Sequence, residues 1–161
     1  MEIRPARPEE LSSVCKLYEQ AQSYMSAHGN PSQWGTAYPP VTLVEEDIRR
    51  GFCHVCVEKG EILGVFSWIP GPDPTYAAIE GSWHGAGAYT VVHRLAVGVY
   101  RRGVASACLS FAKERSSMVR IDTHEDNLPM QETIRRSGFS LCGVIHVEDG
   151  SPRLAYDWCG R

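Results

Sequence analysis

The residues with the clearest potential for chemistry lie in one stretch near the middle of the chain, residues 91–106. The stretch reads as an apolar strand, a short loop with Arg101, Arg102 and Gly103, and the start of an amphipathic helix. A small-residue turn at a helix start exposes backbone N–H groups that no helical carbonyl satisfies, and the positive end of the helix dipole lies beside them. Such a turn binds anions, most often a pyrophosphate. We therefore expect a phosphate-binding loop here, with a solvated turn as the alternative interpretation.

Two common phosphate-binding motifs are absent from the sequence. There is no G-x-x-x-x-G-K-[ST] segment, which argues against a P-loop nucleotidase. Gly85 and Gly87 lack the third glycine of a dinucleotide-binding turn, and the first strand-to-helix junction has no glycine. The expected anion site is therefore of neither type.

Six cysteines are present, and two of them, Cys53 and Cys56, have the C-x-x-C spacing of some zinc and dithiol sites. A structural zinc site normally needs a second ligand pair, which the sequence does not offer. Both residues fall in an apolar run typical of a strand, where residues three apart point to opposite faces. We therefore interpret them as small buried apolar residues, and zinc or dithiol chemistry is the alternative.

Hydrophobic periodicity and turn residues predict the elements that position these groups. Thr42 and Glu45 have the spacing of a capping box at a helix start, and residues 59–61 suit a hairpin turn. The glycine- and proline-rich connection over residues 70–88 is long enough to be functional. The predicted strands are 1–6, 53–58, 62–69, 89–98, 118–123, 139–147 and 153–158, and the predicted helices are 8–29, 42–51, 104–115 and 128–137. This order predicts an α/β fold, a mixed sheet with helices on both faces.

Composition sets the broad class of protein. The chain has 161 residues, of which 43% are apolar and 22% charged, as in an ordinary soluble globular domain. No apolar run approaches the roughly 18 residues of a membrane span, and the first residues lack the apolar core of a secretory signal. A formal net charge of -3 argues against a general nucleic-acid binder. We expect one cytoplasmic domain over residues 1–161, without membrane or nucleic-acid partners.

A second segment joins the first to give a recognisable pattern. Residues 121–127 read I-D-T-H-E-D-N, and Gly138-Phe139 follows the next predicted helix. Together with Leu95-Ala96-Val97 and Arg102-Gly103-Val104-Ala105, this resembles the GNAT superfamily of acyl-CoA N-acyltransferases, and in particular bacterial members with an R-I-D-T-H-x-D-N motif. The resemblance spans nearly the whole chain and implies a central, mostly antiparallel sheet. Two positions depart from the family pattern: Tyr100 stands where the family has Gln or Arg, and Ile134 stands where many members have a catalytic tyrosine.

The resemblance implies an acetyl-CoA site and assigns its residues. The backbone of Leu95, Ala96 and Val97 would pair with the pantetheine amides, and one N–H group would polarise the thioester carbonyl. Asn127 would hold the pantetheine arm, a role compatible with a helix N-cap. The pyrophosphate would lie on Arg101, Arg102, Gly103, Val104, Ala105 and Ser106.

The resemblance further implies acetyl transfer to a primary amine of a small molecule or peptide, directly within a ternary complex. A base must first remove a proton from the ammonium group. His93 and His124 are our candidates. The alternative for His93 is a packing or positioning role, and for His124 it is a loop-edge histidine held by Asp122. For the general acid, Tyr156 on the last predicted strand is our choice in place of Ile134, against a purely structural role. The remaining base candidates and the expected acceptor-binding residues are Glu80, Asp122, Glu125, Trp34, Tyr38 and Trp83.

Two other function classes stay open. A module that binds acyl-CoA without turnover is favoured by Ile134, and a zinc or dithiol protein by Cys53 and Cys56. If the protein is an acyltransferase, we expect no bound metal. The oligomeric state is open between monomer and homodimer.

Overall fold

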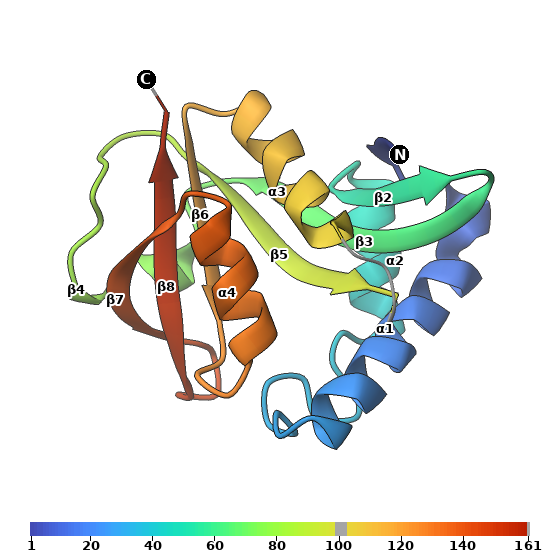
Figure 1. Cartoon of the computed structure of the whole chain (residues 1–161), viewed down its shortest axis with the longest axis horizontal. Helices are drawn as coiled ribbons and strands as arrows, with labels where there is room; N and C mark the ends of the chain where they lie inside the picture. Colours follow the sequence, from blue (N-terminus) through green and yellow to red (C-terminus); the bar gives the residue numbers. More distant parts are fainter. Residues whose placement is uncertain (99–102, 161) are drawn as a thin grey trace.

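The computed structural model describes residues 1–98 and 103–160. They form one sheet in the order β1-β2-β3-β5-β6-β8-β7-β4 (Figure 1). The strands are β1 (Glu2–Pro5), β2 (Cys53–Glu58), β3 (Glu61–Pro70), β4 (Glu80–Gly81), β5 (Thr90–Val97), β6 (Met118–Thr123), β7 (Ser140–His146) and β8 (Pro152–Cys159). The helices are α1 (Leu11–Ala27), α2 (Val41–Arg49), α3 (Val104–Glu114) and α4 (Leu128–Arg136), with 3-10 turns η1 (Pro8–Glu10) and η2 (Pro74–Tyr76). Within the described residues, no helix has the length and apolar character needed to cross a membrane.

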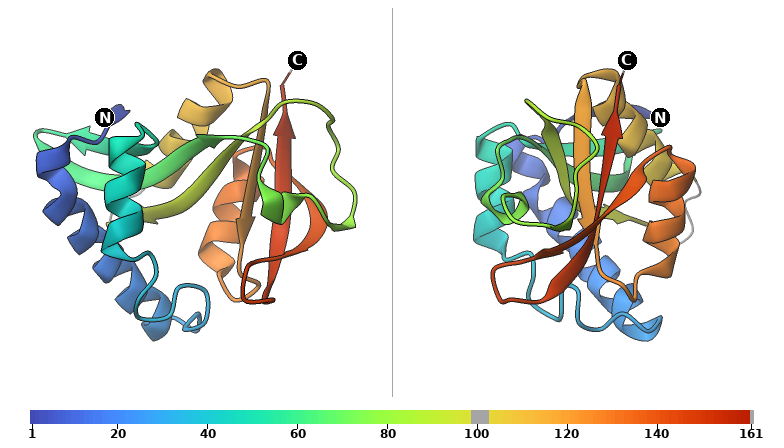
Figure 2. Two further views of the ribbon diagram at one scale, coloured as in Figure 1. Left: turned by 180° about the vertical axis from the view of Figure 1, so that it is seen from behind. Right: turned by 90° about the vertical axis from the view of Figure 1, so that its left-hand side faces the viewer.

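The helices cover both faces of this sheet, as predicted (Figures 1 and 2). Helices α1 and α2 pack on one face in an apolar cluster that includes Val14, Val44 and Cys53. Helices α3 and α4 pack on the other face, where Cys56 and Cys108 are fully buried. Cys53 and Cys56 thus point to opposite faces of β2, which confirms the expectation from strand geometry.

The sheet is antiparallel except where β5 meets β6. These two parallel strands pair only near their starts, at Thr90 with Val119 and at Val91 with Arg120. Beyond those pairs β5 stays with β3 and β6 stays with β8, so the sheet divides between the two strands (Figure 1). The division lies at the carboxyl ends of β5 and β6, where ligands of open α/β sheets gather.

A β-bulge interrupts β5 beside this division. Ser67 of β3 pairs with His93 and Val65 pairs with Ala96, so β5 has one residue more than β3 over the same span. Arg94 takes up the extra length with a φ of 53°. Neither Arg94 nor Leu95 has a Cα partner in the registers of β5 with β3 or β6. A bulge re-aims the side chains around it, and it is common beside active sites.

Two local predictions need correction. The second helix begins at Val41 rather than after Thr42, because the carbonyl of Pro40 accepts the N–H groups of Leu43 and Val44. Thr42 therefore lies in the first turn and is not a cap. The connection over residues 70–88, to which we assigned no helix or strand, contains η2 and the short strand β4, which pairs with β7.

Candidate active site

Two adjoining cavities occupy the division between β5 and β6. The larger, of about 650 Å³, lies between the loop after α1 and the ends of β5, β6 and β8. The smaller, of about 410 Å³, leads from the start of α3 past β5 to the start of α4. Both are lined by Met25, Leu95, Asn127 and Met130, so they meet at the bulge of β5.

The start of α3 forms the outer end of the smaller cavity. Gly103 is the N-cap in the left-handed conformation, with φ of 80° and no side-chain cap. The N–H of Ala107 donates to the Gly103 carbonyl, so the N–H groups of residues 104–106 precede the helical ladder. Val104 is buried, Ala105 lines the cavity and Ser106 is exposed. The expected anion-binding Arg101 and Arg102, like Tyr100, lie outside the described residues.

The strand β5 provides one wall of the smaller cavity. Leu95, Ala96 and Val97 all line it, together with Gly98. Asn127 lines the facing side as the N-cap of α4, and its Oδ1 accepts from the N–H of Met130 at 3.2 Å. The capping role predicted for Asn127 is therefore confirmed.

The side-chain amide of Asn127 also reaches the loop after α1. Its Nδ2 donates to Oε1 of Gln33 at 3.0 Å, and the same oxygen accepts from Nδ2 of Asn30 at 2.9 Å. The backbone carbonyl of Gln33 accepts from Nη2 of Arg153 on β8 at 3.1 Å. Sequence analysis missed Gln33, because no local pattern marks a loop residue that bridges two distant elements.

His93 lies in the larger cavity beside a carboxylate that sequence analysis also missed. Its Nε2 is 2.7 Å from Oδ2 of Asp73, and both side chains are mostly buried. Asp73 is fixed as the N-cap of η2, because its Oδ1 accepts from the N–H of Thr75 and its own N–H donates to Oη of Tyr89. The hydrogen bond with His93 lowers the pKa of Asp73 to about 2, so the carboxylate is ionised at neutral pH. The only local signal was the helix-start pattern Asp-Pro-Thr, which predicts a cap.

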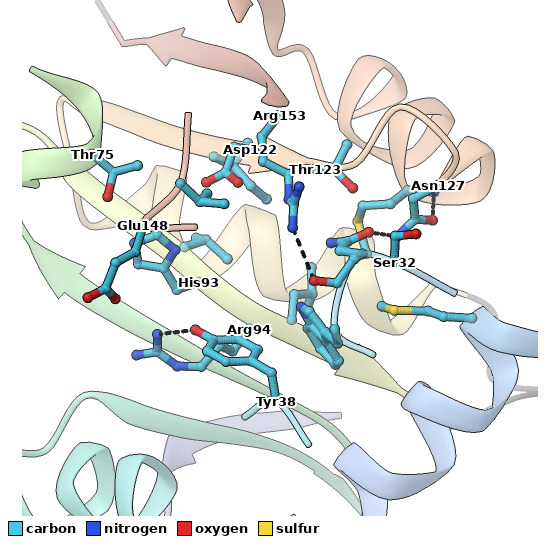
Figure 3. A pocket seen from close by; sticks show the side chains of 18 of the residues that line it. Ser32, Tyr38, Thr75, His93, Arg94, Asp122, Thr123, Asn127, Glu148 and Arg153 are labelled. Carbon is cyan, nitrogen blue, oxygen red and sulfur yellow. Dashed lines mark hydrogen bonds between the residues drawn. The ribbon is translucent and has the colours of Figure 1, made fainter. Parts of the chain in front are cut away.

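Acidic groups dominate one part of this cavity. Asp122 of β6 and Glu148 of the turn before β8 line it (Figure 3). Asp73, the N-cap of η2, and Asp149 line it as well. Asp122 accepts a 2.5 Å hydrogen bond from the hydroxyl of Tyr76, whose pKa is raised well above 10 by burial. Such a concentration of carboxylates attracts a cation.

The aromatic residues expected around an acceptor divide into two groups. Trp34 and Tyr38 line the larger cavity, and Tyr38 accepts a hydrogen bond from Nη1 of Arg94 at 3.2 Å. Trp83 lies outside both cavities, because its ring packs against the guanidinium of Arg120 at 4.0 Å and its N–H bonds the carbonyl of Tyr76. Glu80 also lies outside them, on the exposed strand β4, and Glu125 is exposed as well.

Two candidate proton donors or acceptors are buried beside the site rather than within it. His124 lines neither cavity, and its Nδ1 accepts from the N–H of Asp126 at 3.0 Å. Tyr156 also lines neither, and it belongs to the same core cluster as Ile134. Burial raises the pKa of Tyr156 above 10, so its hydroxyl keeps its proton.

Cys142 has a partner that the sequence did not indicate. Its Sγ lies 3.3 Å from Nδ1 of His84, which is also 2.8 Å from Oδ1 of Asp157. Burial and the hydrogen bond with Asp157 nevertheless raise the pKa of Cys142 to about 12. A thiol with this pKa is a poor nucleophile at neutral pH, and Cys142 lines neither cavity.

No protein-family model matches the sequence, and no curated protein matches it. Solved structures do match. A GNAT-family acetyltransferase from Listeria monocytogenes is 19% identical, with a TM-score of 0.72 over 98% of this chain and 94% of that one. The GNAT-like decarboxylase GphF in complex with isobutyryl-CoA is 16% identical, with a TM-score of 0.71 over 100% of both chains. A GNAT-family acetyltransferase from Streptococcus agalactiae is 31% identical, with a TM-score of 0.91 over 99% of this chain and 95% of that one. This identity over almost the full length of both proteins, together with their closely similar fold, shows that the chain belongs to the GNAT family of acetyltransferases.

Proposed function

We propose that the protein is an acetyl-CoA-dependent N-acetyltransferase that acetylates a primary amine of a small molecule or peptide by direct transfer. One observation carries the proposal: two cavities meet at the bulge of β5, where Leu95 and Asn127 line both. One cavity begins at a helix N-terminus suited to a pyrophosphate, and the other is acidic and suited to an amine. A thioester carried along the first would meet the amine held in the second.

The smaller cavity provides the expected site for the donor. The N–H groups of residues 104–106, which precede the helical ladder of α3 after the N-cap Gly103, would receive the pyrophosphate. The pantetheine arm would run between Ala96 and Val97 on one side and Asn127 on the other. This places the thioester beside Leu95, whose backbone N–H would stabilise the oxyanion. Arg101 and Arg102 remain phosphate ligands by resemblance to the family motif.

His93 is the proposed general base. Because Asp73 is ionised, its carboxylate accepts a hydrogen bond, and Nε2 of His93 must carry the proton that is donated. The lone pair of the ring is then on Nδ1, where it would take the proton of the amine. The free amine then attacks the thioester carbon, the C–S bond breaks, the attacking nitrogen gives up its extra proton to solvent, and the thiolate of CoA takes a proton. Tyr156 of β8 is the proposed donor of that proton, because α4 has Ile134 in the usual tyrosine position. Since its side chain lines neither cavity, it would deliver the proton through an intervening water. Asp73 acts through His93 and is a positioning residue.

A second candidate function rests on Ile134. Without a tyrosine on α4, the protein would bind acyl-CoA and report on it without turnover. Ile134 is fully buried in the core, so it offers no proton to a leaving group. The two functions differ in whether acetyl-CoA is consumed when amines are present.

An amine panel tests the proposal. Purified protein is mixed with acetyl-CoA and, separately, polyamines, amino acids, aminoglycosides and short peptides, and both CoA release and the mass of the N-acetylated product are measured. We expect at least one amine to be acetylated with equal amounts of CoA and product, and we expect His93→Gln to abolish most of that turnover. Tight binding of acetyl-CoA with no product from any amine would contradict the transferase and support the sensor.

A further inference from the structure

Arg153 presents a buried positive charge to the larger cavity. It lies on β8, is 7% exposed, and points from that strand into the cavity (Figure 3). Its Nη1 donates to the carbonyl of Pro152 at 3.0 Å, and its Nη2 donates to the carbonyl of Gln33 at 3.1 Å. Both partners are neutral. Among the described residues, no carboxylate forms an ion pair with Arg153.

The other buried arginines near the site are compensated. Arg94 donates to Oδ2 of Asp47 at 2.7 Å, and both side chains are less than a tenth exposed. Arg120 lies between the rings of Trp83 and Tyr89, each 4.0 Å from its guanidinium carbon. A buried charge is costly unless it is paired, so Arg153 stands apart from these two.

Asp149 is close in sequence but engaged elsewhere. Its Oδ1 accepts hydrogen bonds from the N–H and the hydroxyl of Ser151, and these bonds are the main reason that its pKa is lowered. Arg153 contributes a smaller, longer-range attraction. The carboxylate of Asp149 therefore does not fill the position of a direct partner for the guanidinium.

The cavity wall holds another unused polar group. Thr123 is fully buried, and its Oγ1 has no hydrogen-bond partner within the described part of the chain. It lies at the end of β6, opposite Leu154 in the register with β8. A guanidinium has five N–H donors, and Arg153 uses two of them on carbonyls, which leaves a fork for a bidentate acceptor.

We propose that the acceptor carries a carboxylate in addition to its amine, and that Arg153 binds this carboxylate. The inference rests on the proposed function and names the class of its substrate: an amino acid, or a short peptide with a free carboxylate. Its ammonium end would lie toward Asp73 and Asp122, and its carboxylate toward Arg153. A singly charged carboxylate suits the site better than a phosphate, because four carboxylates line the same cavity.

Matched acceptor pairs test this proposal. For each amino acid acetylated, kcat/KM is compared with that of the corresponding amino acid amide, which keeps the amine and loses the charge. We expect the wild type to prefer the acid by about tenfold or more, and Arg153→Gln to lower this ratio by about ten- to hundredfold, as for a charge-assisted hydrogen bond. Arg153→Lys keeps the charge and should retain part of the preference. Arg136→Gln, on an exposed face of α4, should leave the ratio unchanged.

Several results would overturn the proposal. Equal rates for acid and amide in the wild type would do so while leaving the transferase intact. An equal loss for both members of a pair in Arg153→Gln would show that Arg153 only anchors the loop at Gln33. Comparing free amino acids with dipeptides of the same C-terminal residue identifies the source of the carboxylate, and a preference for either supports the proposal.

A binding measurement separates this proposal from the function on which it rests. If no amine is acetylated, the carboxylate site is tested by calorimetry, in which N-acetyl amino acids and their amides are titrated into the CoA-saturated protein. Binding of the acid that is lost in Arg153→Gln supports the carboxylate site, whereas absence of binding to the wild type overturns it.

Discussion

Oδ2 of Asp73 lies 2.7 Å from Nε2 of His93, although twenty residues separate the two along the chain. The pairing follows from the sheet, because β3 and β5 are antiparallel neighbours and the connection that leaves the end of β3 begins beside the start of β5, close to His93. The ionised carboxylate accepts a hydrogen bond from one ring nitrogen and leaves the other for the base role that we propose. The proposed proton transfer from the amine depends on this pair.

Replacing either member should lower turnover without loss of donor binding. We expect His93→Gln to reduce kcat by about 10²–10⁴-fold, the usual contribution of a general base. Asp73→Asn keeps a hydrogen-bonding group but removes the charge, so we expect a smaller fall of about tenfold. Steady-state kinetics at saturating acetyl-CoA, with calorimetry for donor affinity, measures both. His146→Gln, on an exposed strand position, is the control, and a full kcat in His93→Gln would exclude His93 as the base.

The same pair predicts a pH-dependent contribution to stability. The pKa of Asp73 is lowered from 3.8 to about 2 in the folded state, so its ionised form is the stabilised one. That contribution is complete above the unfolded pKa and is lost as the pH falls from about 4 toward 2. We therefore expect Asp73→Asn to be less stable than the wild type at pH 6, with a difference that shrinks below pH 4. Denaturant unfolding over this range measures it, and a difference that grew in acid would contradict the assignment.

Gly103 tests the proposed pyrophosphate site. A Cβ added there would meet no atom of the described residues within 4 Å, so these residues leave room for a ligand. We expect Gly103→Val to raise the Kd for acetyl-CoA by at least about tenfold, because a branched side chain would occupy the approach to the helix N-terminus. Gly60→Val is the matched control, with φ of 79° and equally open surroundings in a hairpin turn. It should lower the melting temperature to a similar degree and leave the Kd unchanged. Equal Kd values for acetyl-CoA in the two variants would show that the pyrophosphate does not bind at the N-terminus of α3.

Tyr156→Phe tests the proposed general acid. The change removes one oxygen from a buried side chain that has no hydrogen bond to another described residue, so we expect the melting temperature and donor affinity to stay nearly the same. We expect kcat to fall by about tenfold or more, a loss of about 1.4 kcal/mol of transition-state stabilisation. Full activity in Tyr156→Phe would exclude Tyr156 as the general acid and leave water or His124 as the donor of the proton to the CoA thiolate.

The sequence predicted most helices and strands, but it did not predict which side chains of different elements contact one another. Periodicity placed β6 correctly at Met118–Thr123, and strand geometry alone put Cys53 and Cys56 on opposite faces. The pairing of Asp73 with His93 depends on strand order and register, which periodicity does not encode. The same holds for Arg153, which reads as an ordinary strand-end arginine until its neighbours in space are known.

The most direct test of the account is the initial-velocity pattern with both substrates varied. Direct transfer between two cavities that meet at Leu95 requires acetyl-CoA and amine to be bound together, which gives intersecting lines in double-reciprocal plots. Protein incubated with acetyl-CoA alone should keep its unmodified mass. Parallel lines, accompanied by an acetylated protein, would show a covalent intermediate and contradict the account.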